Sequence, residues 1–130
     1  MSDLDDLKAA VEQWIAAYNS RNLDAIAART HDGVTFFNTV SPFALDGKAA
    51  LKQLYQTQFT NFESSIVTPI NLQYRIMGMS GVAWGHVAIA IKPKDGPLRT
   101  IFARLSWALT KEDNKWLPVS MHQSLLPSGH

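Results

Sequence analysis

The first half of the chain carries apolar residues at helical spacing. They recur in steps of three and four at Leu4, Leu7, Val11, Trp14 and Tyr18, which predicts an amphipathic helix of about four turns. Ser2 or Asp3 is expected to cap this helix. Asn22 is expected to cap a short second helix, which ends near a turn at residues 31–33. Asp46 is expected to cap a third helix, whose apolar residues are Leu51, Leu54, Tyr55, Phe59 and Phe62.

The second half of the chain has the composition of long β-strands. β-Branched, aromatic and aliphatic residues dominate at 66–77, 82–92, 98–110 and 116–125, and the turn sequences GMSG, PKDGP and KEDN separate these runs. Two shorter runs, 34–39 and 43–45, are expected to form short strands. Such short connections predict antiparallel neighbours. Helices followed by these strands predict an α+β fold, in which a sheet curls around the helices and leaves a cavity at its open end.

Length and composition restrict the class of protein further. The chain has 130 residues and no internal repeat, so we expect residues 1–130 to form one domain. The formal charge is only +1 and the basic residues are scattered, which argues against electrostatic binding of nucleic acid. The acidic N-terminus is unlike a signal peptide, and no run of about 18 apolar residues predicts a membrane span. A cytoplasmic protein is therefore expected.

Period-two alternation sorts the strand residues into two faces, one of which mixes polar and apolar groups as ligand pockets do. This mixed face is expected to line the cavity. It comprises Gln73 and Arg75, then Trp84 and His86, then Phe102, Arg104 and Ser106, and finally Pro118, Ser120, His122 and Ser124. Trp14, Tyr18, Phe36 and Tyr55 are expected either to line the same cavity or to be plain core.

Arg104 is the most unusual of these residues, because it lies in the middle of an apolar strand. Either it binds an anion in the pocket, or it reaches a helix acid such as Glu12 or Glu63 or extends to water. His122 and His86 are the candidates for a general acid or base. The alternative for His122 is a hydrogen-bonded structural histidine, and the alternative for His86, which follows Gly85, is a position at a bulge on an exposed face.

Several chemistries find no support in the sequence. There is no cysteine and no phosphate-binding glycine loop, and the four histidines lack metal-ligand spacing, so no cofactor and no metal are expected. All eleven acidic residues are placed on predicted helices, helix caps or turns. No carboxylate base is therefore expected on a strand that faces the pocket.

The arrangement resembles the nuclear transport factor 2-like superfamily, the cone-shaped α+β fold that also includes ketosteroid isomerase and the SnoaL-like cyclases. The segments that carry the resemblance are YNSRNLDAIA, DGVTFF, LDGKAALKQL, RTIFARLSWAL and KWLPVSMHQS. Within the superfamily, the association domain of calcium/calmodulin-dependent protein kinase II is especially similar. Arg104 with Trp107, and Trp116 with His122 and Ser124, occupy matching places.

The resemblance implies that Arg104 lies in a deep polar pocket. Phe102 stands where that group tends to be acidic or polar, which implies a smaller or more apolar pocket here. The strand aspartates used by ketosteroid isomerase and by the epoxide hydrolases of this fold are missing, so neither activity transfers. A scytalone dehydratase type of site remains open through His86 and His122.

The resemblance also implies a homodimer through the outer face of the sheet, with higher rings allowed. The second face of the strands fits this role because it is too apolar for an exposed surface. Its expected members are Leu105, Trp107, Leu109, Leu117, Val119 and Met121.

Three hypotheses about function follow. The first is a homo-oligomer that binds a small anionic organic molecule near Arg104 and His122. The second is an isomerase, cyclase or dehydratase that uses a pocket histidine. The third is a purely structural assembly domain.

Overall fold

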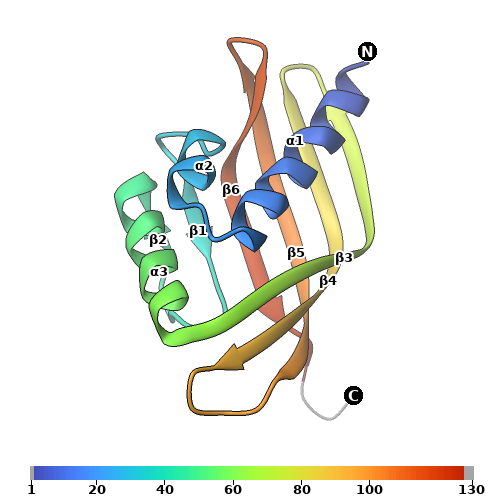
Figure 1. Ribbon diagram of the computed structural model, residues 1–130. Helices are drawn as coiled ribbons and strands as arrows, with labels where there is room; N and C mark the ends of the chain where they lie inside the picture. The colour runs from blue at the N-terminus through green and yellow to red at the C-terminus, as the bar shows by residue number, and fades with distance from the viewer. Residues whose placement is uncertain (1, 128–130) are drawn as a thin grey trace.

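A computed structural model describes residues 2–127 and shows three helices and a six-stranded sheet. The helices are α1 (Asp3–Asn19), α2 (Leu23–Ala28) and α3 (Gly47–Asn61). The strands are β1 (Thr35–Phe37), β2 (Leu45–Asp46), β3 (Phe62–Met77), β4 (Ser80–Pro93), β5 (Arg99–Glu112) and β6 (Lys115–Leu125). In Figure 1 the long strands curve around α1, with α2 and α3 beside it. The predicted α+β fold with a curved, unclosed sheet is confirmed.

Local signals in the sequence explain where the helices begin. The Ser2 hydroxyl caps α1 by accepting a hydrogen bond from the Asp5 backbone N–H at 3.1 Å. The Asn22 side chain caps α2 in the same way, accepting from the Ala25 N–H at 3.0 Å. Asp46 precedes α3, but its carboxylate makes no capping bond and instead accepts a hydrogen bond from the Thr35 hydroxyl at 2.7 Å.

The strands pair in the order β2-β1-β6-β5-β4-β3. All pairs are antiparallel except β1 with β6, which is parallel and places Phe36 opposite Met121. β3 begins at Phe62, four residues earlier than predicted, so Glu63 lies on a strand and not on a helix. Glu112 likewise ends β5, although it was placed in a turn. Neither carboxylate belongs to the wall of the cavity that the sheet encloses.

Helices α1 and α3 pack on the inner face of the sheet and bury its apolar side chains. Ala103, Leu105, Trp107 and Leu109 alternate along β5 and are all less than 5 % exposed. They meet the apolar stripe of α1, which is Leu7, Val11, Trp14, Ile15 and Tyr18. Burial of this much apolar surface is the main favourable contribution to folding.

Register shifts interrupt the ladder at three places. One lies at the start of β3, between Phe62 and Ser64, and the two within the strands bend the sheet. Within β3 the shift falls between Ile70 and Gln73, just after Pro69, and β3 is an edge strand of the sheet. In β6 it falls at Val119, because Ala108 faces Ser120 whereas Leu109 faces Pro118. An extra residue in one strand locally reverses which side chains point inward and increases the bend.

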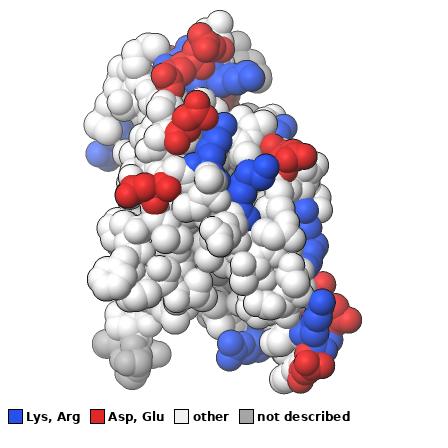
Figure 2. Space-filling model, turned by 90° about the vertical axis from the view of Figure 1, so that its left-hand side faces the viewer, with Lys and Arg blue, Asp and Glu red and all other residues white. Residues whose placement is uncertain are grey.

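The charged residues near α3 form pairs. Lys48 lies 3.1 Å from Asp32 and Lys52 lies 3.4 Å from Asp24. Figure 2 views the molecule from the side on which α3 lies and shows acidic and basic side chains next to one another in its upper half. The charges on this side therefore largely neutralise each other. Within residues 2–127, no helix combines the length and hydropathy required to cross a membrane.

Gly85 is required by the bend of β4, and its replacement tests this. Its φ is +148°, and a Cβ added there would come within 2.7 Å of the Asn71 carbonyl oxygen in the irregular part of β3. We predict that Gly85→Ala lowers the free energy of unfolding by about 2–3 kcal/mol, as measured by urea denaturation. Gly96→Ala is the control, because its nearest neighbour would be the Pro93 ring at an ordinary 3.4 Å. Equal effects of the two substitutions would contradict this explanation.

Candidate functional site

The curved sheet and the helices enclose a cavity of about 60 Å³. Its wall is formed by helices α1 and α3, by the segment after β1, and by strands β3 to β6. The lining residues are Trp14, Ile15, Tyr18, Phe36, Phe37, Asn38, Thr39, Tyr55, Gln58, Val67, Ile89, Leu105, Trp107, Met121, His122 and Gln123. This volume exceeds the ~10–15 Å³ that one water molecule requires but is well below the ~300–1,000 Å³ of drug-sized pockets. The cavity therefore suits a small molecule.

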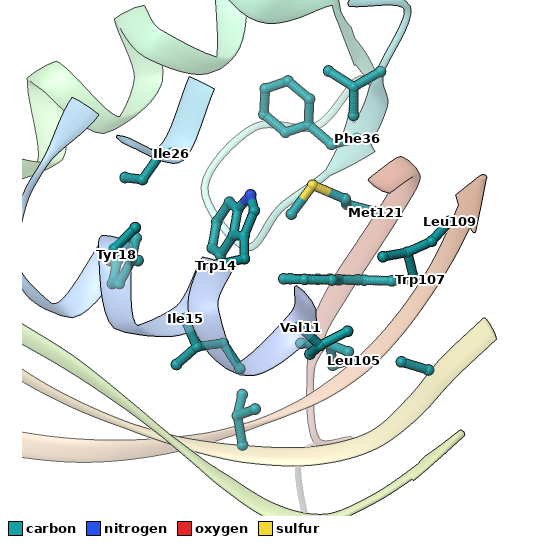
Figure 3. Packing of buried hydrophobic residues seen from close by; sticks show 14 of the residues in the cluster. Val11, Trp14, Ile15, Tyr18, Ile26, Phe36, Leu105, Trp107, Leu109 and Met121 are labelled. Atoms are coloured by element: carbon teal, nitrogen blue, oxygen red, sulfur yellow. The ribbon is translucent and has the colours of Figure 1, made fainter. Parts of the chain in front are cut away.

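Stacked aromatic rings build one wall. Trp14 stacks on Tyr18, one turn along α1, with ring centroids 6.1 Å apart. The edge of Trp107 from β5 meets Trp14 at 4.9 Å, and Tyr55 from α3 meets it at 5.8 Å. Figure 3 shows Trp14 between Tyr18 and Trp107, with the sulfur of Met121 nearby. Aromatic pairs in these geometries stabilise each other by about 0.5–1.5 kcal/mol.

The polar groups around the cavity are uncharged. The Tyr18 hydroxyl donates a hydrogen bond to Gln58 Oε1 at 3.2 Å. It also forms a hydrogen bond with the Ser65 hydroxyl at 2.8 Å, in which either oxygen can be the donor. The indole N–H of Trp14 donates to the Thr30 hydroxyl at 2.9 Å, which fixes the ring. Among residues 2–127, the Tyr55 hydroxyl has no hydrogen-bond partner.

Asn38, which lines the cavity, has a buried donor without a partner among the described residues. Its Oδ1 accepts hydrogen bonds from the backbone N–H groups of Val40 and Ser41, both at 2.9 Å, which fixes the orientation of the amide. The Nδ2 group is then buried and has no partner among the described residues. An unpartnered buried donor costs about 1–3 kcal/mol, and an acceptor in the cavity would remove that cost.

The two tyrosines of the cavity remain protonated at neutral pH. Burial raises the pKa of Tyr18 above its usual value, although the hydrogen bond with Ser65 and the nearby Arg21 oppose the shift. Burial raises the pKa of Tyr55 further, and Tyr18 adds to the effect. Both phenols are therefore neutral hydrogen-bond donors.

The aromatic residues proposed from the sequence do lie at the cavity. Trp14, Tyr18, Phe36 and Tyr55 all line it. His122 also belongs to the lining, but it is an exposed residue whose ring lies against Phe37 at 5.2 Å. It pairs with Ser106, which faces outward, so its imidazole is on the outer side of the sheet.

The expected placement of the other strand residues in the cavity is wrong. Arg75, His86, Phe102, Arg104 and Ser106 are exposed on the outer face of the sheet, and the partly buried Ser124 lies beside Arg104. The Arg104 Nε donates to the Ser124 hydroxyl at 3.2 Å, and His86 is the neighbour of Arg104 on β4. Arg75 stacks over the Trp84 ring at 5.5 Å.

The two faces of the sheet are exchanged relative to the prediction, for two reasons. The helices need an apolar partner, so Leu105, Trp107, Leu109 and Met121 form the core and not a dimer face. A guanidinium inside the cone would lack a carboxylate partner, and burial of an unpaired charge is costly. The register shift at Val119 then separates inward-facing Pro118 from the outward-facing Ser120 and His122.

Sequence patterns missed the polar lining of the cavity. Asn38, Thr39, Gln58 and Gln123 were not among the expected site residues, yet all four line it. Asn38 lies after a short strand and before a Ser-Pro turn, a position typical of an Asx turn, but nothing local shows that its Nδ2 faces a cavity. Among residues 2–127, no group of three or more His, Asp or Glu side chains is placed to hold a metal ion.

The fold and the cavity define a cone-shaped α+β protein of the nuclear transport factor 2-like superfamily. A family model described as the SnoaL-like domain matches residues 7–128, so the chain belongs to the SnoaL-like family. The resemblance stated from the sequence is thus confirmed. No protein of curated function matches the sequence.

Solved structures share the fold over nearly the whole chain. A candidate calcium/calmodulin-dependent protein kinase II association domain from Xanthomonas campestris superimposes with a TM-score of 0.87 at 20 % identity, covering 98 % of this chain and 91 % of that one. A candidate dehydratase of the nuclear transport factor 2-like family from Streptomyces avermitilis gives 0.88 at 14 % identity, with 97 % and 98 % covered. A candidate scytalone dehydratase from Novosphingobium aromaticivorans gives 0.87 at 12 % identity, with 96 % and 85 % covered. At these identities the likeness establishes the fold alone.

The raised pKa values of the cavity tyrosines predict a loss of stability in alkali. Above pH 10 the unfolded chain releases phenolic protons that the folded chain retains, so the free energy of unfolding falls as the pH rises. One such group contributes a slope of at most about 1.4 kcal/mol per pH unit. Urea denaturation at pH 8 to 11 should show a smaller fall in the free energy of unfolding for Tyr55→Phe than for the wild type. Equal falls in the two proteins would contradict the assignment.

Proposed function

We propose that the protein binds a small, uncharged organic molecule, ring-shaped and bearing an acceptor oxygen, in the cavity of the cone. The observation that carries this proposal is the chemistry of the cavity wall, which has aromatic rings and neutral donors but no charged side chain pointing inward. A flat ring matches the aromatic side chains, and a carbonyl oxygen matches the unpartnered amide of Asn38. The ring needs more room than about 60 Å³, so these side chains must move apart to admit it.

The positions of the cations argue against an anionic ligand in this cavity. Arg104 and Arg75, on which the anionic alternative depended, lie on the outer face of the sheet. An anion in the cone would lose its hydration without gaining an opposite charge. This desolvation is unfavourable in free energy. A neutral molecule avoids that penalty and still satisfies the buried donor.

An isomerase, cyclase or dehydratase activity has less support. Such a reaction requires a group that accepts a proton within hydrogen-bond reach of the substrate. Among the lining residues, His122 is the one imidazole and its ring lies on the outer side, while the two phenols remain protonated. Turnover of a cavity ligand that is lost in His122→Gln would favour the enzyme instead.

Acetophenone and benzoate are a matched pair of probes, because the two share a ring and differ in charge. We predict that acetophenone shifts the indole N–H signals of Trp14 and Trp107 in a saturable way and binds at least tenfold more tightly than benzoate. Asn38→Asp keeps the acceptor that holds the turn and removes the donor, so it should weaken acetophenone binding about tenfold, or about 1.4 kcal/mol.

Arg104→Ala is the control for this experiment. It removes a charge from the outer face and should leave acetophenone binding unchanged. Tighter binding of benzoate, abolished by Arg104→Ala, would overturn the proposal and restore the anionic alternative. Failure of every uncharged ring to bind would favour a purely structural domain.

We also propose that the outer face of the sheet forms a homodimer. Large apolar side chains are exposed on this face at Phe37, Ile66, Ile70, Trp84 and Phe102, with exposed fractions of 37–50 %. Several large apolar side chains exposed on one face of a sheet favour burial against a partner. A second copy fits because a two-fold axis places the same patch on both sides of the contact.

Charge substitution on the outer face tests the dimer. We predict that Phe102→Glu raises the dimer dissociation constant at least tenfold, as measured by sedimentation velocity, because the interface would bury an unpaired carboxylate. Phe43→Glu is the matched control, since Phe43 is 77 % exposed but lies before β2 and away from the long strands. A wild-type protein that is monomeric at tens of micromolar, or an unaffected Phe102→Glu dimer, would refute the proposal.

A further inference from the structure

A second hollow lies outside the cone, between α1, the end of α2 and the turn that joins β5 to β6. Its volume is about 450 Å³, larger than that of the cone cavity. Ala9 and Ala10 form its floor on α1, where their small side chains leave room. Arg29 follows α2, and Lys115 and Trp116 begin β6 on the opposite side. We call this hollow the hairpin groove.

Two buried donors of the hairpin groove have no acceptor. Trp116 is only 4 % exposed, yet its indole N–H has no partner among residues 2–127. The Nε of Arg29 is buried and equally unpartnered, although its Nη1 donates to the Ala25 carbonyl at 3.4 Å. The buried indole N–H of Trp14, by contrast, is satisfied by Thr30. Buried donors are normally paired, so two orphans on one groove indicate that an acceptor is absent.

The charges of the groove favour an anion. Arg29 and Lys115 line it, and neither forms an ion pair with a described residue. Two nearby acids are already engaged, because Asp3 pairs with Lys111 at 2.8 Å and Glu112 contacts His31 at 2.5 Å. Asp6 is the one carboxylate in the lining, so the groove carries two positive charges against one negative charge.

We propose that the hairpin groove binds the oxyanion group, a carboxylate or a phosphate, of a small molecule. Arginine N–H groups match the spacing of two oxygens in such a group, and the indole N–H supplies a further donor. Both orphan donors are buried, so a ligand reaches them only when the neighbouring side chains move. This site is independent of the cone, and its ligand carries the charge that the cone excludes.

The indole signals of the folded protein report on the groove directly. Succinate and methyl phosphate are the probes, and succinamide is the uncharged control, all at constant ionic strength. The chain has four tryptophans, and we expect a saturable shift of the Trp116 indole signal, with none at Trp84 on the outer face. Saturation by succinate identifies a carboxylate site, and saturation by methyl phosphate alone identifies a phosphate site.

Substitutions then connect the signal to the groove residues. Arg29→Met and Lys115→Met should each weaken binding, Arg29→Met at least tenfold, and Asp6→Asn should tighten it. Lys115 is exposed at the first residue of β6, so its replacement tests the proposal even if Arg29→Met fails to fold. Arg99→Met removes the same charge from an exposed site on β5 and should have no effect.

Three results would overturn the proposal. The first is the absence of a saturable Trp116 shift with either anion, which would mean that water satisfies the two donors. The second is an equal response to succinamide or to sodium chloride. The third is loss of anion binding in Asp6→Asn, because removal of the one negative charge in the lining should favour an anion.

Discussion

The contact between the aromatic stripe of α1 and the inner face of β5 is the interaction on which the rest of the structure depends. Trp14 meets the edge of Trp107 at 4.9 Å, and Leu105 and Leu109 extend the apolar face on either side. Because the helix offers only apolar groups there, the sheet must offer apolar groups in return. This requirement decides which strand residues point inward, and it sends Arg104 and its polar neighbours to the outer face.

Because the sheet bends, the packed strands and helices enclose a cavity. Gly85 lets β4 pass close to the irregular part of β3. The extra residue at Val119 changes which side chains of β6 point inward. The curved strands leave a small space beside the stacked rings, which the helices alone do not fill. The wall of that space is neutral because charges cannot be buried there without partners. Arg75 and Arg104 instead lie on the outer sheet face, and Arg29 and Lys115 line the hairpin groove.

Much of the fold could be predicted from the sequence, whereas the candidate site could be predicted only in part. Helical spacing identified Trp14 and Tyr18 as inward residues, and both line the cavity. Alternation along β5 correctly divided its residues into two sets, but the polar set was assigned to the wrong side. Alternation is symmetric between the two faces of a strand, so it cannot show which one meets the helices. Asn38 was missed because the local turn with Val40 and Ser41 orients its amide, and the sequence does not show that this turn borders the cavity.

The sequence by itself determined the number, type and order of the helices and strands, since caps, turns and hydrophobic periodicity are local properties of the chain. It also determined that Arg104 has no carboxylate beside it along the strand, which physically favours the exposed position that it occupies. Only the tertiary structure decided the facing of the strands, because that choice depends on which side the helices cover. The cavity beside Tyr55 and the unpartnered donors at Trp116 and Arg29 were likewise decided there, since each arises where segments far apart in the sequence meet.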